Sequence, residues 1–229
     1  MTIDRNQILE WNNHYKNLKN LMFWPSEALI RSLSFIKEKL NFKLKILDYG
    51  CGNGRNANYF NTDLEFTKKK FDYLGYDISK NAIRLAKLKI SSNKFNFDTK
   101  IKKNKFNLIL CIAVLDQMLK FQRKETLNEI YGLMDSKSYI ILDVLTKNKF
   151  IHLQGLGKKI ETDTYILNNS YERGIYQYFF NSADFKNLTK KFEIIYEEDY
   201  LIKNIVFKKL KKFYSRKILI LKKNEKNSN

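Results

Sequence analysis

The first forty residues carry apolar side chains at the spacing of an α-helix. Over 5–20, and again over 25–40, apolar residues recur three or four positions apart, which places them on one face of each helix. They are Ile8, Trp11, Tyr15 and Leu18 in the first stretch and Leu29, Leu33, Ile36 and Leu40 in the second. Pro25, the single proline, suits the first turn of the second helix, where no amide hydrogen is needed.

From residue 44 onward, short apolar runs alternate with helical patterns. Strands are expected at 44–48, 73–77, 95–98, 108–112, 139–144, 192–201 and 217–221. Helices are expected at 55–60, 79–90, 117–134 and 183–191. Strands that alternate with helices indicate an α/β fold, with a parallel sheet covered by helices on both faces.

One segment, 146–181, breaks this alternation. It is polar and aromatic, and it is too long for a plain connection. Because it follows a strand of the predicted sheet, it lies where α/β proteins bind ligands. Its aromatic side chains either line a binding pocket or form the core of a β-hairpin. They are Tyr165, Tyr171, Tyr176, Tyr178, Phe179 and Phe180.

Composition limits the class of protein. A chain of 229 residues with 44% hydrophobic residues can bury one continuous core, so we expect a single domain over 1–229. The two cysteines, Cys51 and Cys111, exclude a disulfide scaffold and form no metal-spaced pair, so no metal site is expected. No apolar run is long enough to span a membrane, and the first residues do not resemble a signal peptide. A cytoplasmic protein is therefore expected.

The formal net charge of +19 has two interpretations. Abundant Lys, Asn, Ile, Phe and Tyr with scarce Gly and Pro is typical of AT-rich genomes, and we favour this compositional origin. The alternative is an anionic partner such as RNA, a membrane surface or a phosphorylated substrate. The basic segment 202–217 would serve that role, either as an amphipathic helix or as an electropositive rim.

The most informative feature is a cluster of glycines between a strand and a helix. Gly50, Gly52 and Gly54 are three of the eight glycines and lie within five residues. Glycine is needed where the backbone is unusual or where a ligand approaches it closely. The start of the following helix offers unpaired N–H groups as well. The turn is therefore predicted to hold a ligand against its backbone.

Glycines alone leave the ligand open. Gly52, Gly54 and Ala57 also satisfy the dinucleotide pattern G-x-G-x-x-A, which favours a nicotinamide oxidoreductase. Two carboxylates favour a different nucleoside ligand. Asp48 at the mouth of the turn suits a cationic amino group, and Asp77 at the end of the second strand can accept from both ribose hydroxyls.

Two stretches resemble the motifs of the class I S-adenosylmethionine-dependent methyltransferases. They are 46–57 (ILDYGCGNGRNA) for the first motif and 73–86 (YLGYDISKNAIRLA) for the second. Further similarity extends through the third and fourth strands, over 44–145. The resemblance implies a three-layer Rossmann-like fold with a mostly parallel seven-stranded sheet. It implies S-adenosylmethionine binding by Asp48, Gly50, Cys51, Gly52, Gly54, Asp77, Ile78, Asp98 and Ile112, with Asp98 on the adenine side.

The sequence departs from the family pattern near the fourth strand. The pair Phe106-Asn107 replaces a frequent aromatic–Asp pair, and Asp116-Gln117 stands where His is often found. The Asn/Asp-Pro-Pro-aromatic signature of many base and amide N-methyltransferases is absent. Methyl transfer depends mainly on positioning, so catalytic residues are hard to identify from sequence. No catalytic residue is assigned.

Three candidates for catalysis carry competing interpretations. His152, in the 146–181 insert, is either a general base or an ordinary loop residue. Asp116 either orients an amine or hydroxyl acceptor or caps the following helix. His14 is either catalytic or a surface or lid residue. Trp11, Tyr15 and Trp24 of segment 1–24 either close over the cofactor as a lid or pack the N-terminal helices onto the sheet. Asp143 is expected to be structural.

These observations favour methyl transfer from S-adenosylmethionine to a small-molecule acceptor that carries a sugar, phosphate or amine. The acceptor is expected between the lid, residues 113–117 and the 146–181 insert. The first alternative is an RNA methyltransferase that uses the basic C-terminal segment. The nicotinamide oxidoreductase and a cofactor-binding pseudoenzyme remain as further alternatives.

Overall fold

The computed structural model describes residues 4–16, 22–40, 43–102, 104–147, 157–168, 172–188, 190–203 and 213–223. The strands of the main sheet are β1 (Leu44–Tyr49), β2 (Phe71–Tyr76), β3 (Phe95–Asp98), β4 (Phe106–Ile112), β5 (Met134–Thr146), β9 (Phe192–Lys203) and β10 (Phe213–Lys223). The helices are α1 (Arg5–His14), α2 (Glu27–Ile36), α3 (Arg55–Thr62), α4 (Leu64–Lys68), α5 (Lys80–Lys89), α6 (Lys120–Leu133) and α7 (Ser182–Leu188), with short 3-10 turns η2 (Lys37–Lys39) and η3 (Leu115–Gln117).

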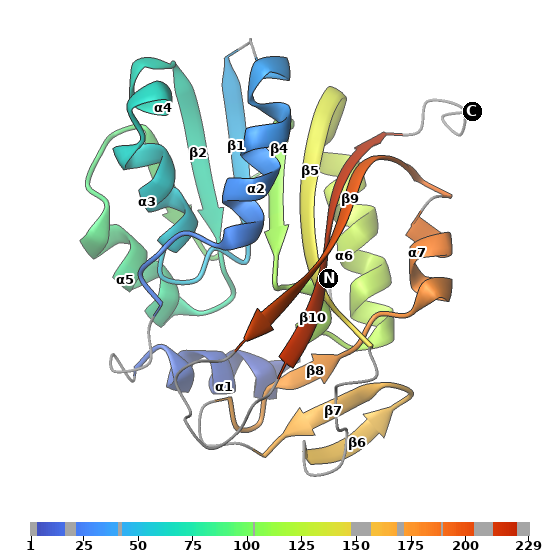
Figure 1. Cartoon of the computed structure of the whole chain (residues 1–229). Helices are drawn as coiled ribbons and strands as arrows, with labels where there is room; N and C mark the ends of the chain where they lie inside the picture. Colours follow the sequence, from blue (N-terminus) through green and yellow to red (C-terminus); the bar gives the residue numbers. More distant parts are fainter. Residues whose placement is uncertain are drawn as a thin grey trace.

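The seven strands form one sheet in the order β3-β2-β1-β4-β5-β10-β9 (Figure 1). The first five run parallel, and β10 pairs antiparallel with both β5 and β9. The predicted strands and their mostly parallel arrangement are therefore confirmed. The chain changes direction between β1 and β4, and this switch point is where α/β sheets bind ligands.

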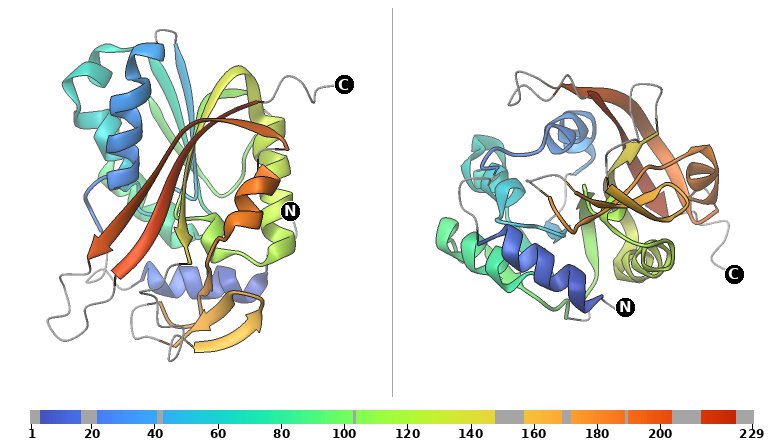
Figure 2. Two further views of the ribbon diagram at one scale, coloured as in Figure 1. Left: turned by 45° about the vertical axis from the view of Figure 1, so that its right-hand side comes forward. Right: turned by 90° about the horizontal axis from the view of Figure 1, so that it is seen from below.

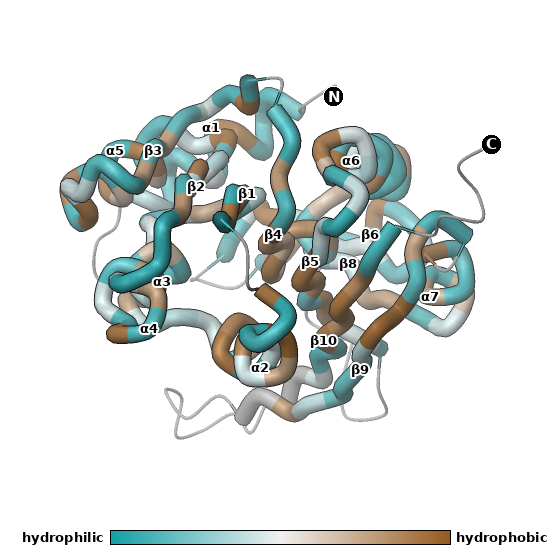
Figure 3. The backbone as a smooth tube through the Cα atoms, turned by 90° about the horizontal axis from the view of Figure 1, so that it is seen from above, coloured by the Kyte–Doolittle hydropathy of each residue, from teal (hydrophilic) through white to brown (hydrophobic). Residues whose placement is uncertain are grey.

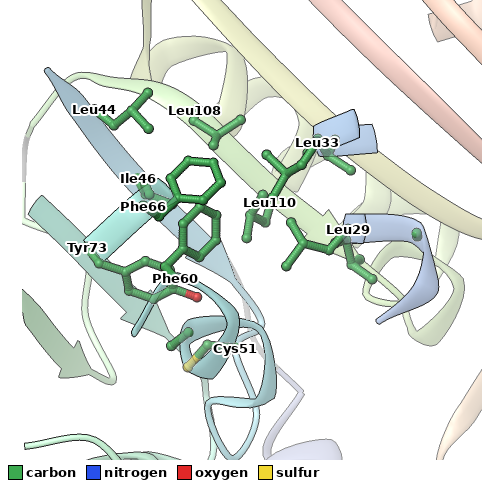
Figure 4. Close-up of a cluster of buried hydrophobic side chains, with 14 of the residues drawn as sticks. Leu29, Leu33, Leu44, Ile46, Cys51, Phe60, Phe66, Tyr73, Leu108 and Leu110 are labelled. Carbon is green, nitrogen blue, oxygen red and sulfur yellow. The ribbon is translucent and has the colours of Figure 1, made fainter. Parts of the chain in front are cut away.

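Helices cover both faces of the sheet and give the three layers. The first four helices after the N-terminal segment, α2 to α5, pack through Leu29, Leu33, Phe60, Phe66 and Ile83 onto one face. Figure 4 shows most of these side chains against Ile46, Leu108 and Leu110 of the central strands. The other face is covered by α6 and α7 through Ile130 and Leu188. The central strands β4, β5 and β10 are strongly hydrophobic, as strands buried on both faces must be (Figure 3).

Local signals account for the start of α2. The side-chain oxygen of Ser26 accepts a hydrogen bond from the Leu29 amide (3.1 Å), which caps the helix. Pro25 therefore lies one residue before the N-cap, and the expectation that it occupies the first turn of the helix is wrong. The first predicted helix is shorter than 5–20, because α1 ends at His14 and Tyr15 is its C-cap.

The insert 146–181 contains a separate small sheet of β6 (Gly157–Glu161), β7 (Thr164–Leu167) and β8 (Tyr176–Tyr178). Both views in Figure 2 place this sheet and α1 together below the carboxyl ends of the parallel strands. Tyr165 and Phe179 pack with Leu145 and Leu167 in a core of their own. Of the two interpretations of the aromatic residues, the hairpin core is confirmed for Tyr165 and Phe179, while Tyr171 lies outside the described residues.

No helix in the described ranges is long and apolar enough to cross a membrane.

Candidate functional site

The glycine turn connects β1 to α3 at the switch point. Gly50 and Gly52 adopt φ angles of 78° and 55°, which non-glycine residues rarely adopt. A Cβ atom on Gly50 would lie 2.4 Å from Val114 Cγ2, and one on Gly52 would lie 2.4 Å from the Tyr15 hydroxyl. The turn is tied to β2 because the amides of Gly50 and Cys51 both donate to the Tyr76 carbonyl (2.7 and 2.9 Å). The backbone of the turn is thus held in place, and because its glycines carry no Cβ atoms, Val114 and the Tyr15 hydroxyl lie directly against it.

Asp77 lies directly beside this turn, where β2 ends. Its Oδ2 accepts from the Gly52 amide (2.9 Å) and its Oδ1 accepts from the Ser79 amide (2.8 Å). Burial raises the pKa of Asp77 to about 6, against the opposing effect of the two amide donors. Each oxygen retains a further lone pair, so the carboxylate can still accept from a ligand hydroxyl.

Asp48 lies below the turn and not at its mouth, which corrects the expected position. Its side chain is only 1% exposed, and its Oδ2 accepts from the Tyr73 hydroxyl (2.6 Å). Burial raises the pKa of Asp48 to about 6, while the bond from Tyr73 lowers it. The reason for the correction is the alternation of the strand. Asp48 points to the same face as Ile46, towards Tyr73 on the neighbouring strand.

The other predicted cofactor residues also gather at the carboxyl ends of the strands. Asp98 ends β3, and its carbonyl accepts from the Asp77 amide (3.3 Å), so the two aspartates are neighbours. Ile112 ends β4 and is buried, and Ile78 follows Asp77 and is half-buried. Cys51 is buried, and burial raises the pKa of its thiol well above the ordinary value. The Cys51 side chain packs in the hydrophobic core beside the turn.

The N-terminal segment reaches the turn through α1. The Tyr15 hydroxyl occupies the space over Gly52. Burial raises the pKa of this phenol most, and the negative charge of Asp77 raises it further. Asn12 fixes the helix in place, since its Oδ1 accepts from the Ser79 hydroxyl (2.9 Å) and from the Asn81 amide (3.3 Å). The lid interpretation did not include Asn12. Its position could have been noticed in the sequence, because Asn12 is a polar residue on the apolar face of the predicted helix 5–20.

Trp24 does not belong to this cover. Its side chain is 84% exposed, so the expectation that it closes over the cofactor is wrong. Trp11 is half-buried and contacts the rings of His14 and Tyr15 instead (centroids 5.3 and 6.0 Å apart). His14 therefore lies among aromatic rings at the end of α1.

On the other side of the switch point, Asp116 lies in η3. It is 1% exposed, and its Oδ2 accepts from Arg216 Nη2 (3.1 Å) and from the Leu145 amide (3.3 Å). The helix-cap interpretation is wrong, because α6 begins at Lys120 with Leu119 as its N-cap. His152 lies outside the described residues.

Arg216 joins Asp116 to Asp143 across β10 and β5. Its Nε donates to both Asp143 oxygens (3.0 and 2.9 Å), and Tyr200 donates to the same carboxylate (3.1 Å). The structural role expected for Asp143 is thus confirmed. Arg216 was expected to belong to a basic rim, and that is wrong, since it is only 8% exposed. Most of the remaining basic segment, 204–212, lies outside the described residues.

A comparison with family models settles the class of protein. A model described as a methyltransferase domain matches residues 40–184, more than half of the chain. The chain belongs to this methyltransferase family. A search of curated protein sequences gives no significant match.

Solved methyltransferases share the fold of this methyltransferase chain. An S-adenosylmethionine-dependent methyltransferase from Anabaena variabilis is 16% identical with a TM-score of 0.67, covering 97% of this chain and 96% of that one. Magnesium protoporphyrin IX methyltransferase from Synechocystis, with bound S-adenosylhomocysteine, is 19% identical with a TM-score of 0.58, covering 86% and 83%. TehB from Haemophilus influenzae is 12% identical with a TM-score of 0.61, covering 94% and 67%.

The predicted S-adenosylmethionine-dependent methyltransferase is thereby confirmed, and the nicotinamide oxidoreductase is not supported. The turn also fits the cofactor of this family. Gly50 and Gly52 leave the backbone of the turn without Cβ atoms, in a positive-φ conformation, beside a carboxylate that can receive hydroxyl groups. Sequence reasoning missed two features near the turn, Asn12 and the Arg216 ion pairs. The second had no local signal, because its partners lie 73 and 100 positions away in the chain.

Proposed function

We propose that this methyltransferase transfers the methyl group of S-adenosylmethionine to a small-molecule acceptor. The cofactor would lie over the glycine turn, with Gly50 to Gly54 exposing backbone to it and Asp77 receiving the ribose hydroxyls. Asp98 would face the adenine side. The observation that supports this best is the glycine turn, whose Gly50 and Gly52 have positive φ angles and no Cβ atoms, beside the Asp77 carboxylate that accepts from the Gly52 amide.

The residues of this chain have distinct tasks in this proposal. Asp48 supports the turn from below through Tyr73, and Asn12 holds α1 over it. When bound, the cofactor supplies an electrophilic methyl group, and the chain contributes position and exclusion of water. Tyr15 on α1 is placed to provide that exclusion, because its hydroxyl already lies against Gly52.

The enclosed acceptor side favours a small molecule over a macromolecule. The helix α1 is bonded to the insert at two points. The Tyr176 hydroxyl donates to Asp4 Oδ2 (2.5 Å), and Gln7 Nε2 donates to the Gly174 carbonyl (2.9 Å). The same helix is bonded to the cofactor side through Asn12. A cover that is bonded on both sides shields the site beneath it from a long strand, which favours a small acceptor.

Calorimetric titration with S-adenosylmethionine and S-adenosylhomocysteine, with and without RNA, tests the proposal. We expect both to bind with an affinity that RNA does not change. Formation of S-adenosylhomocysteine is then measured with an ultrafiltered metabolite extract and with total RNA as acceptor sources. Turnover with the extract alone supports the proposal.

Turnover with RNA alone would favour the RNA methyltransferase, whose RNA binding should weaken steeply with salt. Cofactor binding without turnover from either source would favour the pseudoenzyme. Failure to bind either cofactor form would refute the proposed site.

A further inference from the structure

A buried cluster of charged groups lies beside the glycine turn, on the acceptor side. It contains the carboxylates of Asp116 and Asp143 around the guanidinium of Arg216. Asp116, Asp143 and Arg216 are 1%, 3% and 8% exposed. Buried charges are stable only when they are paired and hydrogen-bonded, so the pairing within the cluster is informative.

Arg216 binds both of these carboxylates. Its Nε binds both oxygens of Asp143, and its Nη2 binds Asp116 Oδ2 and the Asp143 carbonyl (3.1 and 3.3 Å). One guanidinium thus faces two acidic side chains. When both are ionised, the cluster lacks positive charge.

The deficit is concentrated on one atom. Asp116 Oδ1 is buried and has no hydrogen-bond partner among the described residues, although Oδ2 has two. Burial raises the pKa of Asp116, Arg216 lowers it, and Asp143 raises it again. An unpaired carboxylate oxygen in such surroundings requires a donor, and a cationic donor most of all.

The position of this oxygen relates it to the methyltransferase site. Val114, two residues before Asp116, lies over Gly50 of the turn. The insert closes over the same point, since Gln177 Nε2 donates to the Asp116 carbonyl (3.2 Å). Asp116 therefore lies between the cofactor side and the small sheet, beneath the cover formed by α1 and the insert.

We infer that the acceptor carries a cationic amino group, and that this group binds at Asp116 Oδ1. The inference rests on the proposed function, because it places the acceptor beside the glycine turn. The ammonium would supply the missing donor and the missing charge together. A neutral hydroxyl of the same size would supply only the donor. The site therefore discriminates amines from alcohols.

The test compares matched probes on the whole protein at constant ionic strength. Thermal unfolding midpoints are measured with benzylammonium and with benzyl alcohol, in the absence and presence of saturating S-adenosylhomocysteine. We expect the ammonium to raise the midpoint of the wild type and the alcohol to have no comparable effect. In Asp116→Asn, the ammonium should bind at least about tenfold more weakly, a loss of about 1.4 kcal/mol. Asp72→Asn is the control, since it removes the same charge at an exposed site.

The outcomes separate the inference from the proposed function. Equal effects of ammonium and alcohol, or no effect of either, would overturn the inference, and so would an unchanged ammonium response in Asp116→Asn. Should that variant fail to fold, the comparison of ammonium with alcohol on the wild type still decides the inference. The shift caused by S-adenosylhomocysteine alone tests the proposed function independently of any amine.

Discussion

Asp77 offers the sharpest test of the cofactor site, because its two oxygens are fixed by backbone amides. In Asp77→Ala, the amides of Gly52 and Ser79 both lose their acceptor. A buried amide without a partner costs about 1–3 kcal/mol, so the free energy of unfolding should fall by roughly 2–6 kcal/mol. The loss of charge-assisted bonds to the ribose weakens cofactor binding by a further amount of about 1.5–3 kcal/mol, which does not affect the stability of the free protein.

Asp77→Asn separates these two effects. Its amide oxygen replaces one acceptor, while its NH₂ group faces one of the two backbone N–H groups, so one amide remains unpaired. We expect a loss of stability of about 1–3 kcal/mol and a cofactor affinity lower by roughly 10–100-fold. Calorimetric titration with S-adenosylhomocysteine gives the affinity, and urea unfolding gives the stability.

The comparison needs a matched control and a defined refutation. Asp72→Asn removes the same charge from β2 at an exposed site that is paired with Lys43, so it should alter neither quantity appreciably. A folded Asp77→Asn that binds S-adenosylhomocysteine as tightly as the wild type would refute the assignment of Asp77 to the ribose. Lower stability with unchanged affinity would restrict Asp77 to holding the turn.

Three further predictions address the turn, the support beneath it and the cluster beside it. Gly52→Val should abolish cofactor binding while the far-UV circular dichroism stays native, because its side chain would collide with the Tyr15 hydroxyl; normal binding by calorimetry would contradict the close approach of the backbone. Burial raises the pKa of Asp48 to about 6, above its unfolded value of about 4, so its contribution to stability falls as pH rises from about 4 to about 6. Between those pH values the wild type should therefore lose roughly 2–3 kcal/mol more stability than Asp48→Asn. Identical pH slopes of the urea-unfolding free energy in the two proteins would refute this. Arg216→Met should lower the free energy of unfolding by about 3–5 kcal/mol, since it leaves Asp143 buried without its cation; a loss below about 1 kcal/mol would show that the ion pair is dispensable.

The parts of the fold that follow from local patterns could be predicted from the sequence. The glycine turn is one case, because Gly50, Gly52 and Gly54 meet a backbone requirement within five residues. The parallel strands are another, since each is a short apolar run between helical patterns. Boundaries were less accurate. Strand β5 begins at Met134, directly after α6, although only 139–144 was expected. Residues 135–138 are Asp, Ser, Lys and Ser, so they form no apolar run that would predict a strand. The pairing of β5 with β4 is also irregular there.

The parts of the site that depend on pairing between distant residues could not be predicted. Arg216 stands among lysines in the sequence, and its neighbours indicate a charged surface. In the structure, the alternation of β10 turns Arg216 inward, where Asp116 and Asp143 from two other elements receive it. Burial of an arginine is favourable only because both carboxylates are present, and they lie 73 and 100 positions away. The burial of Arg216 is therefore determined by pairing across the fold, and the same pairing leaves Asp116 Oδ1 without a hydrogen-bond partner among the described residues.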